Sequence, residues 1–199
     1  MPRLQLNKSA LAHERTQLAT FRRFLPSLDL KRQQLLAARA AARADAAQAE
    51  GVVEALARRV GREVPMLALE DVELDGLVQL ADFELASENV VGTRLPTLRR
   101  IEVRVRDYSA FARPQWVDAV AALLHDMLEA RLRVQIAHER VRLLDRAVTT
   151  ITQRVNLFEH VLIPTAQANI KKIRTALGEE EMQAVVRSKI AKRKKASAA

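Results

Sequence analysis

The sequence predicts a mainly α-helical protein, in which two long helices form an antiparallel coiled coil and a small middle subdomain contains a short β-hairpin. Three observations predict this fold. Only 5 glycines and 6 prolines occur among 199 residues, and the chain is rich in alanine, leucine and arginine, which favour helices. Apolar residues recur at alternating spacings of three and four along both flanks. One middle segment alternates strictly between apolar and polar residues, which is typical of a half-buried strand.

Residues 1–62 are predicted to form the N-terminal coiled-coil helix. Their apolar stripe is interrupted by Glu14, Arg32 and Arg39. Small alanines in the stripe would let two helices approach closely, and Pro26 is expected to kink the helix because it lacks a backbone N–H. The stripe consists of Leu11, Leu18, Phe21, Leu25, Leu28, Leu35, Ala42, Ala46, Ala49, Val53, Leu56 and Val60.

Residues 63–113 are predicted to form the middle subdomain, because six of the eleven glycines and prolines lie between Gly61 and Pro114. Ile101–Arg106 alternates as a strand does, and Val78–Leu85 is a weaker strand candidate. Glu88–Gly92 resembles a turn in part. Together these segments predict a short β-hairpin.

Residues 114–199 are predicted to form the C-terminal coiled-coil helix with a basic tail. Pro114 suits a first helical turn, and Asp118 adds a negative charge near the positive end of the helix dipole. Beyond Leu162 the stripe shifts by four residues to Ala166, Ile170, Ile173 and Leu177, a stutter that locally unwinds a supercoil. Before the shift, thirteen apolar residues fill the stripe: Val120, Leu123, Met127, Ala130, Val134, Ala137, Val141, Leu144, Val148, Ile151, Val155, Phe158 and Leu162.

Each stripe needs a partner, and the middle subdomain is long enough to let the chain turn back on itself. We therefore expect the two stripes to pack against each other as an intrachain antiparallel coiled coil. The C-terminal helix is the longer of the two and is expected to overhang its partner.

The formal net charge is +9, and it is unevenly distributed. The net charge is +6 over residues 1–63, −4 over residues 64–112, +4 over residues 113–177 and +3 over residues 178–199. Basic ends suit a nucleic acid, an anionic membrane or an acidic protein surface. The tail Lys189–Lys195 fits a solvated helix end or a nucleic-acid arm, although it contains no aromatic residue for base stacking.

Sequence motifs for catalysis are absent. The chain has no cysteine, no nucleotide-binding glycine loop and no zinc-protease motif. The four histidines have no ligand-like spacing, and we expect them to be solvated or to pack beside the seam: His13, His125, His138 and His160. A calcium-loop pattern from Asp71 to Gly76, closed by Asp82, departs from the usual ligands at Glu73 and at its closing position. We expect no catalytic residue, no cofactor and no metal site.

The segment from Gln153 to Ile173 resembles the C-terminal signature of the D subunit of V-type and archaeal A-type rotary ATPases. The N-terminal segments Asn7–Leu11 and Leu30–Leu35 resemble the opening helix of that family, and Phe24–Leu28 is similar to its bacterial branch. Gly178 stands where members usually carry an acidic residue. The signature matches are Arg154, Val155, Asn156, Glu159, Ile163 and Pro164, followed by Ile170, Ile173 and the acidic run Glu179–Glu181.

The resemblance implies a non-catalytic central stalk, or rotor axle, that couples ATP hydrolysis or synthesis to ion translocation. Its partners would be a head of A and B subunits, a small F subunit bound by the middle region, and a funnel subunit that links to the membrane rotor ring. It would lie at the cytoplasmic face of the membrane as a peripheral part of the complex. Six basic residues are predicted to contact the head: Lys8, Arg15, Arg22, Arg187, Lys189 and Lys192.

Two other protein classes fit the same composition. A basic coiled-coil nucleic-acid-binding protein would dimerise and bind with a steep salt dependence. A scaffold or membrane-tethering coiled coil would place its seam between chains rather than within one.

Overall fold

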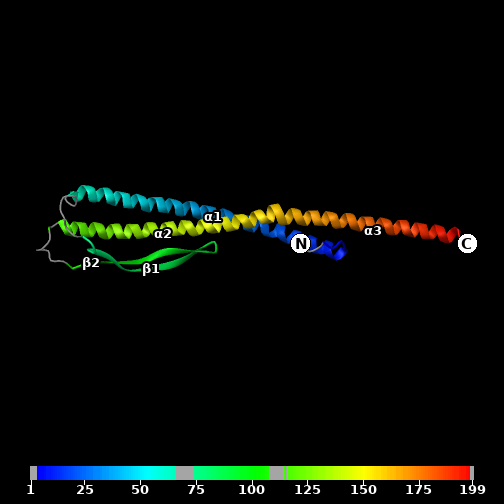
Figure 1. Ribbon diagram of the computed structural model, residues 1–199, viewed down its shortest axis with the longest axis horizontal. Coiled ribbons are helices and arrows are strands. Elements are labelled where there is room, and N and C mark those ends of the chain that lie inside the picture. The colour runs from blue at the N-terminus through cyan, green and yellow to red at the C-terminus, as the bar shows by residue number, and fades with distance from the viewer. Residues whose placement is uncertain (1–3, 66–73, 108–113, 115, 198–199) are drawn as a thin grey trace. The chain divides into compact units, whose positions relative to one another are not determined.

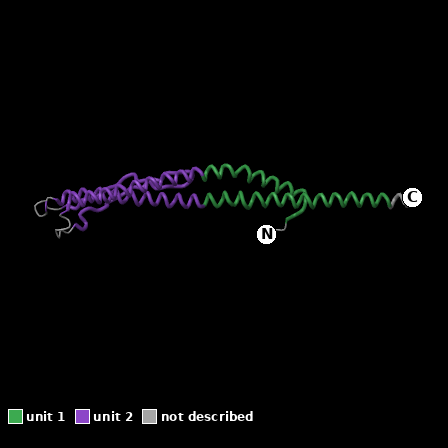
Figure 2. Tube along the Cα trace, turned by 90° about the horizontal axis from the view of Figure 1, so that it is seen from above, with its two compact units in different colours: residues 1–32, 150–199 green, residues 33–149 purple. Residues whose placement is uncertain are grey.

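The computed structural model describes residues 4–65, 74–107, 114 and 116–197. The predicted fold is confirmed: two long helical segments flank a two-stranded antiparallel hairpin (Figure 1). The chain divides into two compact units, residues 1–32 with 150–199 and residues 33–149 (Figure 2). The elements are α1 Lys8–Glu63, β1 Val78–Val90, β2 Thr93–Val105, α2 Trp116–Asn156, the π-helix η2 Leu157–Leu162, and α3 Ile163–Ser197.

Within residues 33–149, α1 and α2 run antiparallel. Arg43 of α1 contacts Asp145, and Glu50, nearly two turns further along α1, contacts His138. The contacted residue number falls along α2 as the residue number rises along α1, so the two helices are antiparallel. The predicted stripe residues of this unit are buried or half-buried, and those with less than a tenth of their surface exposed are Leu35, Ala42, Ala46, Val120, Leu123, Ala130, Leu144 and Val148.

Within residues 1–32 and 150–199, the start of α1 packs against the segment from the end of α2 into α3. The rings of Phe21 and Phe158 meet edge to face, with centroids 5.5 Å apart and an interplanar angle of 79°. Asn169 donates a hydrogen bond of 3.1 Å from Nδ2 to Glu14 Oε1. The buried residues of this unit belong to the predicted stripe: Ile151, Val155, Ala166, Ile170 and Ile173.

The shift predicted beyond Leu162 begins where η2 ends, and the wider turn of a π-helix takes up an additional residue. The backbone N–H of Ile163 donates to the carbonyl of Phe158, five residues back rather than four. Pro164 follows at once; it has no N–H to donate, and its ring crowds the preceding turn of a regular α-helix. The wider turn accommodates the proline and carries the stripe from Leu162 to Ala166.

The helix ends follow from local chemistry. The Oδ1 atom of Asn7 accepts the Ala10 N–H at 2.7 Å and caps the start of α1. The carbonyl of Pro114 accepts the Val117 N–H at 3.0 Å, so Pro114 stands just ahead of α2. Helix α1 continues without a break through Pro26, and helix α3 continues without a break through Gly178. The kink expected at Pro26 stays a prediction.

The hairpin is longer than the sequence predicted, because β1 reaches Val90. The partial turn expected within Glu88–Gly92 is formed by Val91 and Gly92, and residues 88–90 belong to β1. Both turn residues have positive φ, +52° and +83°, as a type I′ turn in a two-residue hairpin loop requires. The Gly92 N–H donates to Asn89 Oδ1 at 2.9 Å and supports the turn.

The base of the hairpin is packed against the start of α2. Leu77 lies in one buried cluster with Val117 and Ala121, and its carbonyl accepts the Arg106 N–H at 2.8 Å. A second buried cluster, Val64 with Val120 and Leu123, joins the end of α1 to the same helix. These clusters hold the hairpin beside the coiled coil.

Val91 is strained, because a β-branched residue in the left-handed region is disfavoured by about 1–2 kcal/mol. We expect Val91→Asn to stabilise the hairpin, since asparagine before glycine suits this turn. Hydrogen exchange of the β1 and β2 amides should slow by about fivefold, equivalent to about 1 kcal/mol. Val90→Asn, within the strand, is the control; equal effects of the two substitutions would contradict the strain at Val91.

Candidate partner-binding surfaces

The three predicted head-contact residues of α1 lie on one line. Lys8, Arg15 and Arg22 are spaced by seven residues and are all exposed. Seven residues are nearly two helical turns, so the three cations project from the same side of α1. The helix thus presents a row of basic side chains formed by the three residues that the sequence analysis selected.

The three predicted residues of α3 are exposed but do not form one cluster. Lys189 and Lys192 share a shallow cleft with Arg193, Val186 and Ile190. Arg187 is two residues from Lys189, about 200° around the helix, and therefore projects from nearly the opposite side. Its Nη2 atom donates to Gln183 Oε1 at 3.3 Å.

An apolar stripe continues along α3 beyond Leu177, although the interpretation of this segment as a basic tail overlooked it. Every described residue from 178 to 193 is exposed, as the predicted overhang requires. We call four of these residues the terminal stripe, and their exposed fractions run from 49% to 68%: Met182, Val185, Val186 and Ile190. The sequence could have indicated this stripe, because the last three residues follow the first by three, four and eight positions, as apolar residues on one face of a helix do.

The signature residues divide between the interior and the surface. Val155 is buried and Ile163 is half-buried, whereas Arg154, Asn156 and Glu159 are exposed. Pro164 is exposed and is the second residue of α3, two residues after the end of η2. The signature therefore surrounds the π-helix, with its apolar members in the interhelical packing and its polar members facing outward.

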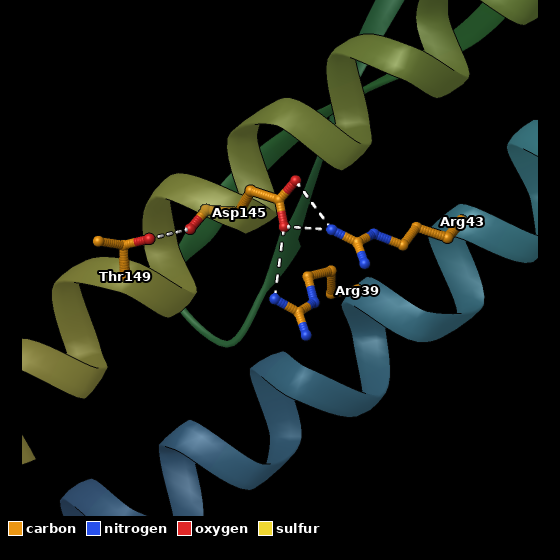
Figure 3. A network of polar contacts seen from close by, with 4 residues as sticks. All are labelled: Arg39, Arg43, Asp145 and Thr149. Carbon is orange, nitrogen blue, oxygen red and sulfur yellow. Dashed lines mark hydrogen bonds and ion pairs between the residues drawn. The ribbon is translucent and has the colours of Figure 1, made fainter.

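A polar cluster bridges α1 and α2 where Arg39 interrupts the apolar stripe (Figure 3). Asp145 accepts from Arg43 Nη2 at 3.0 Å and from Arg39 Nη1 at 3.5 Å. The hydroxyl of Thr149 donates to the carbonyl of Asp145 at 2.9 Å. A charge at a stripe position is tolerated here because a carboxylate on the facing helix pairs with it. The sequence showed the interruption but not its partner.

Arg140 of α2 holds the outer half of the hairpin. Its Nη1 atom donates to the carbonyl of Pro96 at 3.2 Å and to Thr97 Oγ1 at 3.0 Å, and its Nη2 atom donates to Glu88 Oε2 at 3.1 Å. The side chain is only 24% exposed. One arginine thus joins α2 to both strands. Sequence reasoning missed this contact, because nothing in the sequence pairs residue 140 with residues 88–97.

Within the described ranges, no group of three histidine, aspartate or glutamate side chains is placed to hold a metal ion. His138 instead pairs with Glu50 at 2.7 Å. Asp82 accepts the Phe83 N–H at 2.8 Å, while Asp71 and Glu73 of the calcium-loop pattern lie outside the described residues. In the same described part of the chain, no helix has the length and apolar character needed to cross a membrane.

Comparison with known proteins shows the family. Residues 10–193 match the protein family described as the ATP synthase D subunit. The chain belongs to this family. It is 32% identical to the V-type ATP synthase D subunit of Borreliella burgdorferi over 192 residues, which cover 96% of this chain and 95% of that relative. It is 30% identical over 193 residues to the protein of the same description from Chlamydia muridarum, with the same coverage.

Membership of the D-subunit family confirms the expected rotary-ATPase subunit and makes the chain a member of an ATP synthase complex. The comparisons give no support to a nucleic-acid-binding or scaffold coiled coil. The D subunit is a structural component of the complex. The resemblance stated from the signature residues therefore extends over almost the whole chain.

Arg140 is expected to control the order of the hairpin. Arg140→Gln removes the charged donor, at a cost of about 1 kcal/mol, so hydrogen exchange near Thr97 should accelerate by about fivefold. Arg142→Gln is the matched control, because Arg142 pairs with Glu139 of its own helix. Unchanged exchange in the Arg140 variant would show that other contacts fix the hairpin.

Proposed function

We propose that the chain is the central stalk of a V/A-type rotary ATPase, a non-catalytic rotor that couples ATP hydrolysis or synthesis in an A/B head to ion translocation. The observation that carries this proposal is the family match over residues 10–193, together with the long paired helices. A rotor must transmit torque, and two helices joined by a filled apolar seam and by interhelical ion pairs resist twisting as a unit.

The proposed contacts with the head use the charged and apolar surfaces of α1 and α3. The basic residues are Lys8, Arg15, Arg22, Arg187, Lys189 and Lys192. Ion pairs at such exposed positions contribute only about 0–1 kcal/mol each, so they can exchange as the rotor turns. The terminal stripe supplies apolar contacts on the same part of α3, where no described residue covers it.

The middle of the chain is proposed to bind the small F subunit, and the funnel subunit to link the stalk to the membrane rotor ring. A position at the cytoplasmic face of the membrane, held through these partners, agrees with the lack of a membrane-spanning helix in the described residues. The rotor role needs no bond-forming chemistry, so no catalytic group or cofactor is assigned to it.

Affinity purification of the tagged chain from native membranes at moderate salt tests the proposal. We expect the A, B and F subunits to co-purify with ATPase activity. Recovery of the chain alone, or together with nucleic acid, would overturn the rotor assignment.

The terminal stripe is expected to be needed for the head contact. Ile190→Glu places a charge within the stripe and should reduce recovery of the A and B subunits by about tenfold, the effect of losing about 1.4 kcal/mol. Ala184→Glu is the control, because residue 184 lies on another side of α3. Circular dichroism of both variants checks the helix, and equal recoveries would remove the terminal stripe from the head contact.

A further inference from the structure

The end of α3 extends beyond the helix that pairs with it. Glu14 of α1 contacts Asn169, and α1 begins six residues earlier, at Lys8. Because α1 runs antiparallel to α3, its start is level with about residue 175 of α3. Every described residue from 178 to 193 is exposed. We call residues 178–193 the overhang, and among the described residues no second helix covers its terminal stripe.

The charges of the overhang are segregated along its length. The acidic run Glu179–Glu181 lies at the start, and Lys189, Lys192 and Arg193 lie at the end. All of these side chains are exposed, and no ion pair within the described part of the chain involves them. A matching neighbour therefore offers cations at the acidic end and carboxylates at the basic end. A second copy of the overhang has this arrangement when its direction is reversed.

An antiparallel second copy also matches the apolar residues when the pair is centred on Val186. In this register Met182 is level with Ile190 of the second copy, because both lie four residues from the centre. Glu179 is level with Arg193 of the second copy, because both lie seven residues from the centre. Two-fold symmetry repeats each of these contacts, so one surface patch serves both copies.

The residues that would meet also lie on matching sides of α3. Glu179 and Arg193 are fourteen residues apart, nearly four helical turns, so both project close to the terminal stripe. Glu181 and Lys192 are eleven residues apart, nearly three turns, so both project from one edge of the stripe. A two-fold axis brings that edge of one helix beside the same edge of the other. Glu181 then lies beside Lys192 of the second copy.

The same charges disfavour a parallel pair of overhangs. In a parallel pair in register, Lys189 and Arg193 of one copy would lie beside the same cations of the other. The acidic run Glu179–Glu181 would likewise face its own copy, and such juxtaposed like charges repel. The charge pattern of the overhang therefore selects the antiparallel direction.

We propose that, in the absence of the A/B head, the overhangs of two copies of this chain pair as an antiparallel helix dimer centred on Val186. Pairing removes the terminal stripe from water while the subunit is unassembled. The paired segment has only about four helical turns, so the interface is small and reversible. The head contact proposed above uses the same stripe, so the head displaces the second copy. This displacement rests on the proposed function, whereas the pairing does not.

The chain contains no cysteine, so a single introduced cysteine reports on one position. The full chain is purified alone and oxidised, and we expect Val186→Cys to form a disulfide-linked dimer in about tenfold higher yield than Ala184→Cys, on another side of α3. Met182→Cys should match the low control, because its two thiols would lie about 12 Å apart along the helix axis. A mixture of Met182→Cys and Ile190→Cys chains should form the mixed dimer.

Charge reversal tests the ion pairs between the two copies. Glu179→Lys with Glu181→Lys, in the Val186→Cys chain, should lower the yield of the disulfide-linked dimer about tenfold, and Lys192→Glu with Arg193→Glu should do the same. Mixing the two charge-reversed chains restores opposite charges at both ends of the pair. The yield of the mixed dimer should therefore return to that of the Val186→Cys chain. This recovery also shows that both charge-reversed chains are folded.

Three outcomes would overturn the pairing: equal yields for Val186→Cys and Ala184→Cys, a high yield for Met182→Cys, or a mixture of charge-reversed chains that does not recover. Purified A and B subunits, added before oxidation, are expected to lower the Val186→Cys yield about tenfold. A yield that stays high while A and B bind the chain would overturn the displacement. Failure of the proposed function has a separate signature, because A and B would then not bind the chain at all.

Discussion

The apolar seam between the two long helical segments is the constraint on which the rest of the structure depends. In each compact unit the stripe residues are buried or half-buried, and helices of this length gain stability from such packing rather than from intrinsic propensity. Of the three charged residues in the N-terminal stripe, two meet a partner on the facing helix, whereas Arg32 pairs with Asp29 of α1 itself. Glu14 meets Asn169, and Arg39 meets Asp145 across the seam. These pairs also fix the antiparallel register, since a shift of either helix would separate them.

Two surfaces of the chain present apolar side chains that no other described residue covers. Apolar side chains recur at helical spacing beyond Leu177, yet every described residue from 178 to 193 is exposed. The hairpin also presents exposed apolar side chains, because Leu80, Phe83 and Leu85 of β1 are 40%, 44% and 47% exposed. An apolar row without cover is costly in water. The family match makes this chain a component of a larger complex, and such a complex has other subunits to cover these surfaces.

The signature segment surrounds the π-helical turn η2. Pro164 cannot donate a backbone hydrogen bond, and η2 precedes it with a wider turn. The stripe shifts at this point without losing burial, since Val155 and Ala166 are both buried on either side. Such π-helical turns are often found at functional sites. The exposed members Arg154, Asn156 and Glu159 lie around this turn, whereas the apolar members hold the two helices together.

The sequence by itself determined the helices, their stripes, the stutter and the family, because these depend on periodicity and on short-range chemistry. It also located part of both strands and the turn between them, but it did not show that Val91 adopts a positive φ, which is not expected of a valine. Only the tertiary structure decided that Arg140 holds the hairpin, that Asp145 pairs with Arg39 and Arg43, and which apolar residues stay exposed. Those outcomes depend on which segments distant in sequence become neighbours, and a one-dimensional pattern does not contain that information.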